Sequence, residues 1–303
     1  MTILISACII TYNQEKFIRK AIEGAVKQTV SCNYEIVLAD DYSSDSTNQI
    51  CLEYLEKYPN LIRLLSNEKN LGMIANWTNA ITACQGKYIA LCEGDDYWTD
   101  PHKLQKQVDF LEANPDYMMC FHNVEILNED KSISIDNPNF VTQDTFTQVD
   151  FLKTNIAHTA SVVFRSESFI HIPQWFSEVE FGDWSLYLYI LQFGKAKYYN
   201  DVMAVYRKHS SSIHSYLHKN ETGMVEVWQK HIRFNHLIRK HITNNPILSN
   251  PILRENLFSY HYNLFVLCFR LKRFREAFVH VFQMFRIEPK KVIIILKSYI
   301  KFI

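Results

Sequence analysis

The sequence lacks the signals of several protein classes. Lys and Arg are as numerous as Asp and Glu, 32 of each in 303 residues, and a neutral chain argues against a nucleic-acid-binding protein, whose footprint is a basic face. The seven cysteines include no CxxC pair, and several lie inside apolar runs, which indicates reduced core residues of a cytosolic protein. No apolar run approaches the ~18 residues needed to cross a bilayer. We therefore expect no nucleic-acid partner and no membrane span.

Glycine-rich phosphate motifs and a secretion signal are absent as well. No GxGxxG follows the first apolar run and no GxxxxGK[ST] occurs anywhere, so neither a dinucleotide fingerprint nor a P-loop is supported. We therefore expect any phosphate ligand to be held through a metal. The first residues run directly into a strand, without the basic region or cleavage site of a signal peptide. This start predicts a soluble, cytoplasmic chain.

Apolar runs and helical periodicities alternate through the first hundred residues. With 48% hydrophobic residues, the chain can build a large core, and its length favours one large domain plus a smaller one. Four such alternations predict an α/β fold with a doubly wound, mixed but mostly parallel sheet and helices on both faces. The expected strands are Leu4–Ile10, Glu35–Ala39, Leu61–Leu65 and Tyr88–Cys92, and the expected helices are Phe17–Val26, Ser44 or Asp45 to Tyr58, and Asn70 to Gly86.

The rest of the chain predicts further strands and a helical end. The polar stretch Asn128–Thr147 is interpreted as a loop or lid. From Glu221 the pattern is helical, with Pro246 and Pro251 marking a break before a pair of helices at 253–285. Strand patterns occur at 117–127, 160–164 and Val202–Tyr206, and helical spacing runs from Phe181 to Phe193.

Two of the predicted strands end in acids, at Asp40-Asp41 and at Glu93-Gly94-Asp95-Asp96. Right-handed crossovers bring the carboxyl ends of such strands to one edge of the sheet, where ligands bind in open α/β folds. Crowded carboxylates repel one another, and a hard cation such as Mg²⁺ or Mn²⁺ relieves the repulsion. A solvated acidic turn is the alternative that the local pattern leaves open.

Four motifs in succession resemble those of family 2 glycosyltransferases. Their order and spacing match over the first hundred residues. The resemblance implies the GT-A fold, a nucleotide-sugar donor (UDP- or dTDP-linked), a divalent metal and inversion at the anomeric carbon. The motifs are Ile9-Ile10-Thr11-Tyr12-Asn13, the stretch from Asp40 to Thr47, Asn70-Leu71-Gly72, and Glu93-Gly94-Asp95-Asp96.

The resemblance also implies a division of the chain and roles for single residues. Residues 1–220 would form a GT-A catalytic domain, with a donor-binding half at 1–100 and an acceptor half at 101–220, and residues 221–303 a helical C-terminal region. Asp95-Asp96 takes the place of the family's DxD motif, with Asp96 as the direct metal ligand. The donor-binding candidates are Thr11 and Tyr12, at the base or ribose, Asp41, which accepts a hydrogen bond from the pyrimidine, and Asn13, Asn70, Gly72 and Asp95.

The chain departs from the family pattern at two positions. Tyr42 replaces a frequent glycine, and the proline that commonly precedes Thr11 is absent. Neither position carries a ligating atom, so both bear on the detail of donor binding rather than on the class.

Asp183 has two interpretations. At the start of a predicted helix it is a good N-cap, whereas at the family's position it is the general base that takes the proton from the acceptor hydroxyl. The family usually carries Glu-Asp, but Gly182 precedes Asp183 here. Only the aspartate of that pair therefore has a counterpart in this sequence. An inverting transfer needs one base and charge stabilisation at the diphosphate. A retaining hydrolase would need a second, nucleophilic carboxylate nearby and does not explain the upstream motifs.

Tyr206-Arg207-Lys208-His209 resembles a Tyr-Arg-x-His segment that closes over the diphosphate in the family. The resemblance places Arg207 at the anionic leaving group and makes His209 a second candidate metal ligand. An exposed polar loop is the alternative for each residue taken singly.

The C-terminal end combines positive charge with apolar residues. Residues 267–303 carry nine Lys or Arg against two Glu and include the apolar run Val292–Leu296. This composition suits the anionic inner face of the cell membrane, where a lipid-linked acceptor would be found. A terminal helix that packs on the core, or on a second subunit of a homo-oligomer, is the alternative.

Taken together, the patterns favour an inverting glycosyltransferase that depends on Mn²⁺ or Mg²⁺. It would add a sugar to a saccharide or lipid-linked acceptor in bacterial surface polysaccharide synthesis. One alternative is a catalytically degenerate relative that binds nucleotide or sugar without turnover. The other is a sugar-phosphate nucleotidyltransferase, which would need a glycine-rich N-terminal loop with basic residues.

Overall fold

The computed structural model describes residues 3–135, 143–169, 172–210, 220–242 and 246–300. Two compact units form the chain. The first comprises Met1–Phe151, Asn155–Ser177 and Gly182–Lys208, and the second comprises Leu152–Thr154, Glu178–Phe181 and His209–Ile303. The division of function at residue 220 stays a prediction.

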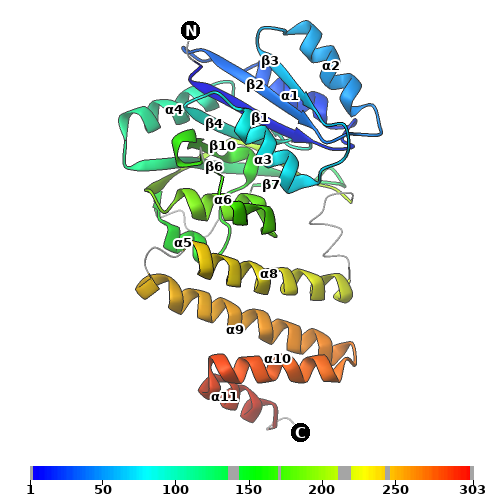
Figure 1. Ribbon diagram of the computed structural model, residues 1–303, viewed down its shortest axis with the longest axis vertical. Coiled ribbons are helices and arrows are strands. Elements are labelled where there is room, and N and C mark those ends of the chain that lie inside the picture. Colours follow the sequence, from blue (N-terminus) through cyan, green and yellow to red (C-terminus); the bar gives the residue numbers. More distant parts are fainter. Residues whose placement is uncertain (1–2, 136–142, 170–171, 211–219, 243–245, 301–303) are drawn as a thin grey trace. The chain divides into compact units, whose positions relative to one another are not determined.

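A mixed sheet organises the first unit, in the order β3-β2-β1-β4-β9-β6-β10-β5 (Figure 1). The pairs β1–β2, β2–β3, β1–β4 and β6–β10 are parallel, while β9 runs antiparallel to both β4 and β6. The predicted mixed, mostly parallel sheet is therefore confirmed. The strands are β1 (Ile5–Thr11), β2 (Tyr34–Asp40), β3 (Ile62–Ser66), β4 (Tyr88–Glu93), β5 (Tyr97–Trp98), β6 (Tyr117–Asn128), β7 (Ile133–Ile135), β8 (Thr145–Phe146), β9 (Val163–Arg165) and β10 (Lys195–Lys208).

Helices cover both faces of this sheet. One core cluster joins the central strands to α1 (Ile18–Val26), α2 (Thr47–Lys57) and α4 (Lys103–Ala113). On the other face, nearer the viewer in Figure 1, lie α3 (Met73–Ala83) and α6 (Gly182–Ile190). A short helix, α5 (Gln148–Lys153), follows β8.

Helices make up most of the second unit: α8 (Glu221–His241), α9 (Pro246–Arg270), α10 (Phe274–Ile287) and α11 (Pro289–Ile300). Phe258, Met284 and Val292 form a small buried core between the last three helices. Within the described residues, no helix is both long and apolar enough to span a membrane.

Several elements of the structure differ from those that the sequence patterns predict. No helix was predicted at 103–113, because two of the buried positions of α4 are the polar residues Lys103 and Gln107, which disguise its apolar face. Asn128–Thr147 is not entirely loop, since β7 and β8 lie in it. Pro251 lies inside α9 instead of ending it.

Strand β10 extends well beyond the predicted Val202–Tyr206. Its first half is polar, and register shifts between Tyr199 and Ala204 interrupt its pairing with β6. A bulge of this kind breaks the alternation of side chains by which a strand is recognised. Strand β9 is also shifted from the predicted 160–164, because Thr159–Ser161 forms a 3-10 turn.

Candidate active site

The carboxyl ends of three parallel strands meet at one edge of the sheet. Thr11 at the end of β1 lies opposite Asp40 at the end of β2, and Ile10 lies opposite Glu93 at the end of β4. Backbone hydrogen bonds continue this alignment into the following turns, from the Asp41 N–H to the Thr11 carbonyl (3.0 Å) and from the Gly94 N–H to the Ile10 carbonyl (2.9 Å). Both predicted acidic motifs therefore lie at the same edge.

The buried carboxylate of Asp41 organises the loop before α3. Its Oδ1 accepts hydrogen bonds from Asn67 Nδ2 (2.9 Å) and the Leu71 N–H (2.8 Å), and its Oδ2 accepts one from the Gly72 N–H (2.9 Å). Gly72 has a φ of +87°, which glycine adopts without strain. Asn70 Nδ2 donates to the Asp41 carbonyl (3.1 Å). The predicted donor residues Asp41, Asn70 and Gly72 are thus brought together.

Asn13 and Asp40 connect the loops that follow β1 and β2. Asn13 Oδ1 accepts from the Ser44 N–H (2.8 Å), and the Asn13 N–H donates to Ser43 Oγ (2.8 Å). Ser43 in turn donates to the Asp40 carboxylate through both its N–H and its hydroxyl. Tyr42, between these groups, has a φ of +64°. This left-handed conformation is costly for a tyrosine and explains why glycine is frequent at this position.

Thr11 and Tyr12 differ in what they offer to a ligand. Thr11 is buried, and its hydroxyl donates to Gln14 Oε1 (2.9 Å). Tyr12 is exposed, so its ring is open to a base or ribose. A Cβ added at Gly94 would come within 2.7 Å of Thr11 Oγ1, so the turn after β4 needs a glycine to pack against β1.

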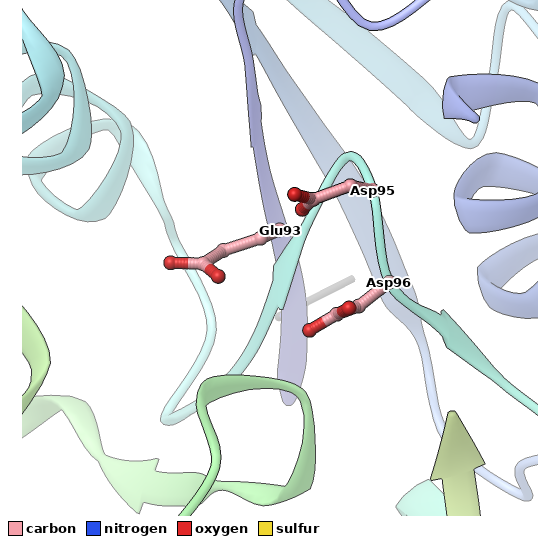
Figure 2. A group of neighbouring side chains, drawn as sticks. All are labelled: Glu93, Asp95 and Asp96. Carbon is pink, nitrogen blue, oxygen red and sulfur yellow. The ribbon is translucent and has the colours of Figure 1, made fainter. Parts of the chain in front are cut away.

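Three carboxylates form an acidic cluster, Glu93, Asp95 and Asp96, in the turn after β4. One oxygen from each lies within 4.8 Å of the others, and Figure 2 shows the side chains pointing to the same side of the turn. Asp96 is buried, and its Oδ1 accepts from the Arg207 N–H (2.8 Å). Among the described residues no donor reaches Asp96 Oδ2.

The electrostatics of the acidic cluster fit a cation. Burial, followed by the Asp95 carboxylate, raises the pKa of Glu93 to about 8. Burial and the neighbouring Asp95 and Glu93 carboxylates raise the pKa of Asp96 well above its usual range. A divalent cation favours the charged forms and takes oxygen ligands, and the orphaned Oδ2 of Asp96 offers it a direct ligand. These residues could therefore hold Mg²⁺ or Mn²⁺.

Arg207 supports this turn from β10. Its guanidinium donates to the Asp95 carbonyl and lies over the rings of Tyr97 (4.5 Å) and Phe17 (5.2 Å). A guanidinium held in this way fixes the acidic turn against β10. Its role at a leaving group stays a prediction. His209 belongs to the second compact unit and is not part of the acidic cluster found among the described residues, so its role as a metal ligand also stays a prediction.

Asp183 lies in the first turn of α6. Its Oδ2 accepts a hydrogen bond from Asn155 Nδ2 (2.7 Å). Burial raises the pKa of Asp183, against the opposing effects of the Trp184 N–H and the Asn155 amide. The negative charge of Asp183 also contributes to the raised pKa of Glu93, after burial and Asp95. The structure thus brings the candidate base and the acidic cluster together.

Two other residues interact with these acids, and the sequence patterns assign a role to neither. Asn155 is far from Asp183 in the sequence and no motif contains it. Tyr206 has its pKa raised by burial and then by the acidic cluster and Asp183, and the ring of His158 lies 4.8 Å from the ring of Tyr206. A strand residue such as Tyr206 can be assigned to a site only when its sheet neighbours are known.

The fold and this acid-lined edge define a GT-A-type α/β protein. Residues 6–172 match the sequence profile of glycosyl transferase family 2, and the chain belongs to this family.

Related proteins agree with this assignment. The chain is 37% identical over 221 residues to the uncharacterised protein Rv1520 of Mycobacterium tuberculosis, an alignment that covers 73% of this chain and 62% of that protein. It is 32% identical over 130 residues to WfgD of Escherichia coli, with 43% of this chain and 49% of WfgD covered. WfgD is named a UDP-Glc:alpha-D-GlcNAc-diphosphoundecaprenol beta-1,3-glucosyltransferase. The chain therefore spans less than two thirds of the length of these relatives.

Two solved structures share the fold. S. aureus TarS (1–349) in complex with UDP-GlcNAc superposes with a TM-score of 0.69 at 17% identity and covers 96% of this chain and 83% of TarS. The mannosyltransferase PcManGT of Pyrobaculum calidifontis, in complex with GDP-Man and Mn²⁺, superposes with a TM-score of 0.62 at 16% identity. That alignment covers 100% of this chain and 81% of PcManGT.

Proposed function

We propose that the protein is a metal-dependent, inverting glycosyltransferase that uses a nucleotide-sugar donor, UDP- or dTDP-linked. The observation that carries the proposal is the electrostatic interaction of the acidic cluster, which contains the orphaned Asp96 Oδ2, with the half-buried Asp183. An inverting transfer needs these two functions, charge stabilisation at the diphosphate and a base at the acceptor.

The acidic cluster and the loops beside it form the donor side. Asp96 and Asp95 would hold a Mg²⁺ or Mn²⁺ ion, which stabilises the charge of the diphosphate when bound. Asp41 and the exposed Tyr12 would receive the nucleoside. The Asn70-Leu71-Gly72 loop, tied to Asp41 by three hydrogen bonds, keeps that part of the edge rigid.

Asp183 performs the proton transfer. The acceptor hydroxyl oxygen forms a bond to the anomeric carbon while the bond from that carbon to the diphosphate oxygen breaks, and the hydroxyl proton goes to Asp183 Oδ1. The hydrogen bond from Asn155 occupies Oδ2 and so directs the other oxygen toward the acceptor. Burial raises the pKa of Asp183, which makes it a better base than an exposed aspartate.

The acceptor is a saccharide or a lipid-linked saccharide in bacterial surface polysaccharide synthesis. The name of WfgD, which specifies a diphosphoundecaprenol-linked acceptor, supports this part of the proposal. TarS with UDP-GlcNAc and PcManGT with GDP-Man and Mn²⁺ support the donor class and the metal. We place the enzyme in the cytoplasm at the inner face of the membrane, contacted through the C-terminal tail, with a homo-oligomer as the alternative use of that tail.

A donor-hydrolysis assay tests the function. Purified protein is incubated with UDP- and dTDP-sugars with Mn²⁺, with Mg²⁺ or with a chelator, and nucleoside diphosphate release is measured. We expect release that depends on the metal, and a thermal shift with the same donor, because a ligand that binds only the native state stabilises it. A thermal shift without turnover, even with saccharide acceptors present, would favour the degenerate relative. Formation of nucleotide sugar from a sugar phosphate would favour the nucleotidyltransferase.

A further inference from the structure

Helix α10 exposes an unusual number of phenylalanines. Its buried side chains are Ala277 and Met284, on the side that packs against α9 and α11 (Figure 1). Most of its remaining large apolar side chains are open to solvent, with Phe278 75% exposed and Phe282 62% exposed. The exposed members are Phe274, Phe278, Val279, Phe282 and Phe285, and Phe269 at the end of α9 is also exposed.

These phenylalanines lie along one face of α10. Positions 274, 278, 282 and 285 follow helical spacing, so their side chains form one stripe, ~17 Å long at 1.5 Å per residue. Phe269 extends the stripe, since its ring lies 5.4 Å from that of Phe274. We call this surface, Phe269 together with the exposed apolar residues of α10, the phenylalanine face. An exposed aromatic patch of this size marks an interaction site.

Unpaired positive charges border the phenylalanine face. Arg275 and Arg286 are exposed on the adjacent side of α10, and Lys272 and Lys290 are exposed beyond its two ends. Within the part of the chain that the structure describes, none of these four is in an ion pair, whereas the nearby Arg273 pairs with Glu276. Elsewhere in 267–303, Arg270, Arg273 and Lys291 pair with Glu221, Glu276 and Glu255, so among the described side chains of this segment the four residues on and beside α10 carry the unpaired charge. Positive charge is therefore concentrated around the aromatic stripe.

The chemistry of the phenylalanine face distinguishes an anionic bilayer from a second copy of the chain. In a symmetric dimer each patch contacts the same patch of its partner. That arrangement would bring the unpaired Arg275 and Arg286 of one copy close to the same positive charges of the other copy, and like charges at an interface repel one another. An anionic bilayer instead attracts the basic residues and accepts the aromatic rings in its interface. Since no described helix can span a membrane, the fitting arrangement is a helix that lies in the surface plane.

We propose that the phenylalanine face docks the protein onto an anionic lipid bilayer, with α10 lying parallel to the surface. This inference deepens the proposed function and rests on it for its purpose, because a lipid-linked acceptor is held in a bilayer. It extends the expected membrane contact from the tail to the preceding helix, α10. In the predicted tail run Val292 is buried against Phe258 and Met284, whereas Ile293 and Ile294 are exposed, so the aromatic stripe of α10 adds to the exposed apolar residues of α11.

Vesicle sedimentation of the full chain tests the inference. The probes are vesicles of phosphatidylcholine alone and of phosphatidylcholine and phosphatidylglycerol in equal parts. We expect binding only to the anionic vesicles, and weaker binding at high salt. Phe278→Ser with Phe282→Ser should reduce the partition coefficient at least about tenfold, and Arg275→Gln with Arg286→Gln roughly fivefold per residue. Both pairs are exposed, so the fold should survive.

Matched controls lie in the first unit. Ile133→Ser with Ile135→Ser removes two apolar residues that are also largely exposed, and Lys57→Gln with Lys131→Gln removes two exposed charges. Neither pair should change vesicle binding. Equal binding by wild type and the phenylalanine variant, or no binding at all, would overturn the proposal. So would a concentration-dependent dimer that the phenylalanine variant abolishes in the absence of lipid.

Donor hydrolysis in vesicle-free buffer separates this inference from the proposed function. All of these variants should hydrolyse donor like wild type, because none lies among the residues assigned to the reaction. Vesicle binding without hydrolysis would contradict the proposed function and leave the docking face intact. Hydrolysis without vesicle binding would contradict the docking face and leave the proposed function intact.

Discussion

Two groups of acids at the same sheet edge have opposite surroundings. Asp40 and Asp41, after β2, accept hydrogen bonds from side chains and from the Ser43, Leu71 and Gly72 N–H groups. The acidic cluster after β4 places three carboxylates within 4.8 Å of one another. Among the described residues, Asp96 Oδ2 there is buried and has no donor.

This difference separates carboxylates that already have several hydrogen-bond donors from a carboxylate oxygen that has none. A carboxylate with several N–H donors is stabilised in its charged form and fixes the loops that supply them. A buried carboxylate oxygen without a donor costs free energy, on the order of 1–3 kcal/mol or more for a charged group. Proteins keep such an unfavourable group mainly where it has a function. A bound cation would offset the cost here.

Asp183 belongs to neither group, and its replacement should have the largest effect. Asp183→Asn keeps the size of the side chain and an oxygen that can accept from Asn155, so the fold and donor binding should survive. Loss of the base should lower the transfer rate by about 10²–10⁴. The measurement is initial-rate kinetics beside UDP binding, with the exposed Glu178→Gln as control. Turnover within a few-fold of wild type would leave Asp183 with a structural role only, in the first turn of α6.

Lys103 extends the comparison to a positive charge that is buried without a carboxylate partner. Its ammonium donates to Gln107 Oε1 (2.8 Å) and lies 4.5 Å from the centre of the Trp98 ring. Burial lowers the pKa of Lys103 to about 7. The unfolded chain keeps this proton up to about pH 10.4, so between these pH values the unfolded state binds more protons. Stability should therefore rise with pH across that range, by at most roughly 1.4 kcal/mol per pH unit.

Lys103→Met removes this charge and should abolish that slope. The variant should also be more stable than wild type near pH 7, because no buried ammonium has to be desolvated. Denaturant unfolding at several pH values measures both effects, with the exposed Lys57→Met as control. An unchanged slope in Lys103→Met would show that the amine is not the source of the pH dependence.

Replacement of Asp41 tests the acids after β2, whose carboxylates already accept several hydrogen bonds. Asp41→Ala leaves the Leu71 and Gly72 N–H groups without their acceptor and removes the proposed contact to the base. UDP or dTDP binding should weaken by roughly 1–3 kcal/mol. Asn67→Ala is the matched control, because it removes one bond to Asp41 but keeps the carboxylate. If both variants weaken UDP equally, Asp41 only builds the loop, and an unchanged UDP affinity in Asp41→Ala would show that the nucleotide lies elsewhere.

Replacement of Asn155 should have the smallest effect on the transfer rate. Its hydrogen bond lowers the pKa of Asp183, so Asn155→Ala should move the acidic limb of the pH–rate profile to higher pH. Loss of orientation should cost about tenfold in rate at neutral pH, since an amide-to-carboxylate bond is worth roughly 1.5 kcal/mol. Asn155→Asp would add a second negative charge and shift the limb further. A purely structural role would lower stability and leave the limb in place.

The first half of the fold was predictable because its strands are short apolar runs. β1 to β4 end within a residue or two of the predicted positions, since parallel strands buried on both faces have continuous apolar sequences. α4 was not predictable, because Lys103 and Gln107 occupy buried positions and are satisfied by each other. β10 was found only in part, because its first half is polar and its register shifts.

The candidate site was predictable where its residues are adjacent in sequence. Asp95 and Asp96 follow one strand, so topology alone brings them to the ligand edge. Asn155 reaches Asp183 through the packing of distant segments, which no local pattern encodes. Tyr206 belongs to the Tyr-Arg-x-His segment, but that pattern does not show its interaction with Asp183. The four hydrogen bonds that Asp41 accepts from residues 67–72 could not be predicted either, although the motifs at 40–47 and 70–72 are recognisable in the sequence.

Calorimetric titration of UDP into wild type and Asp96→Asn, with Mn²⁺ or with chelator, tests the central claim most directly. An amide at position 96 can still accept from the Arg207 N–H but is a poor ligand for a hard cation. We predict that Mn²⁺ strengthens UDP binding by wild type on the order of tenfold or more and leaves the affinity of Asp96→Asn unchanged. In chelator the variant should melt at a higher temperature than wild type, because a buried carboxylate without a partner is gone. The same Mn²⁺ enhancement in both proteins would contradict the assignment of the acidic cluster as the metal site.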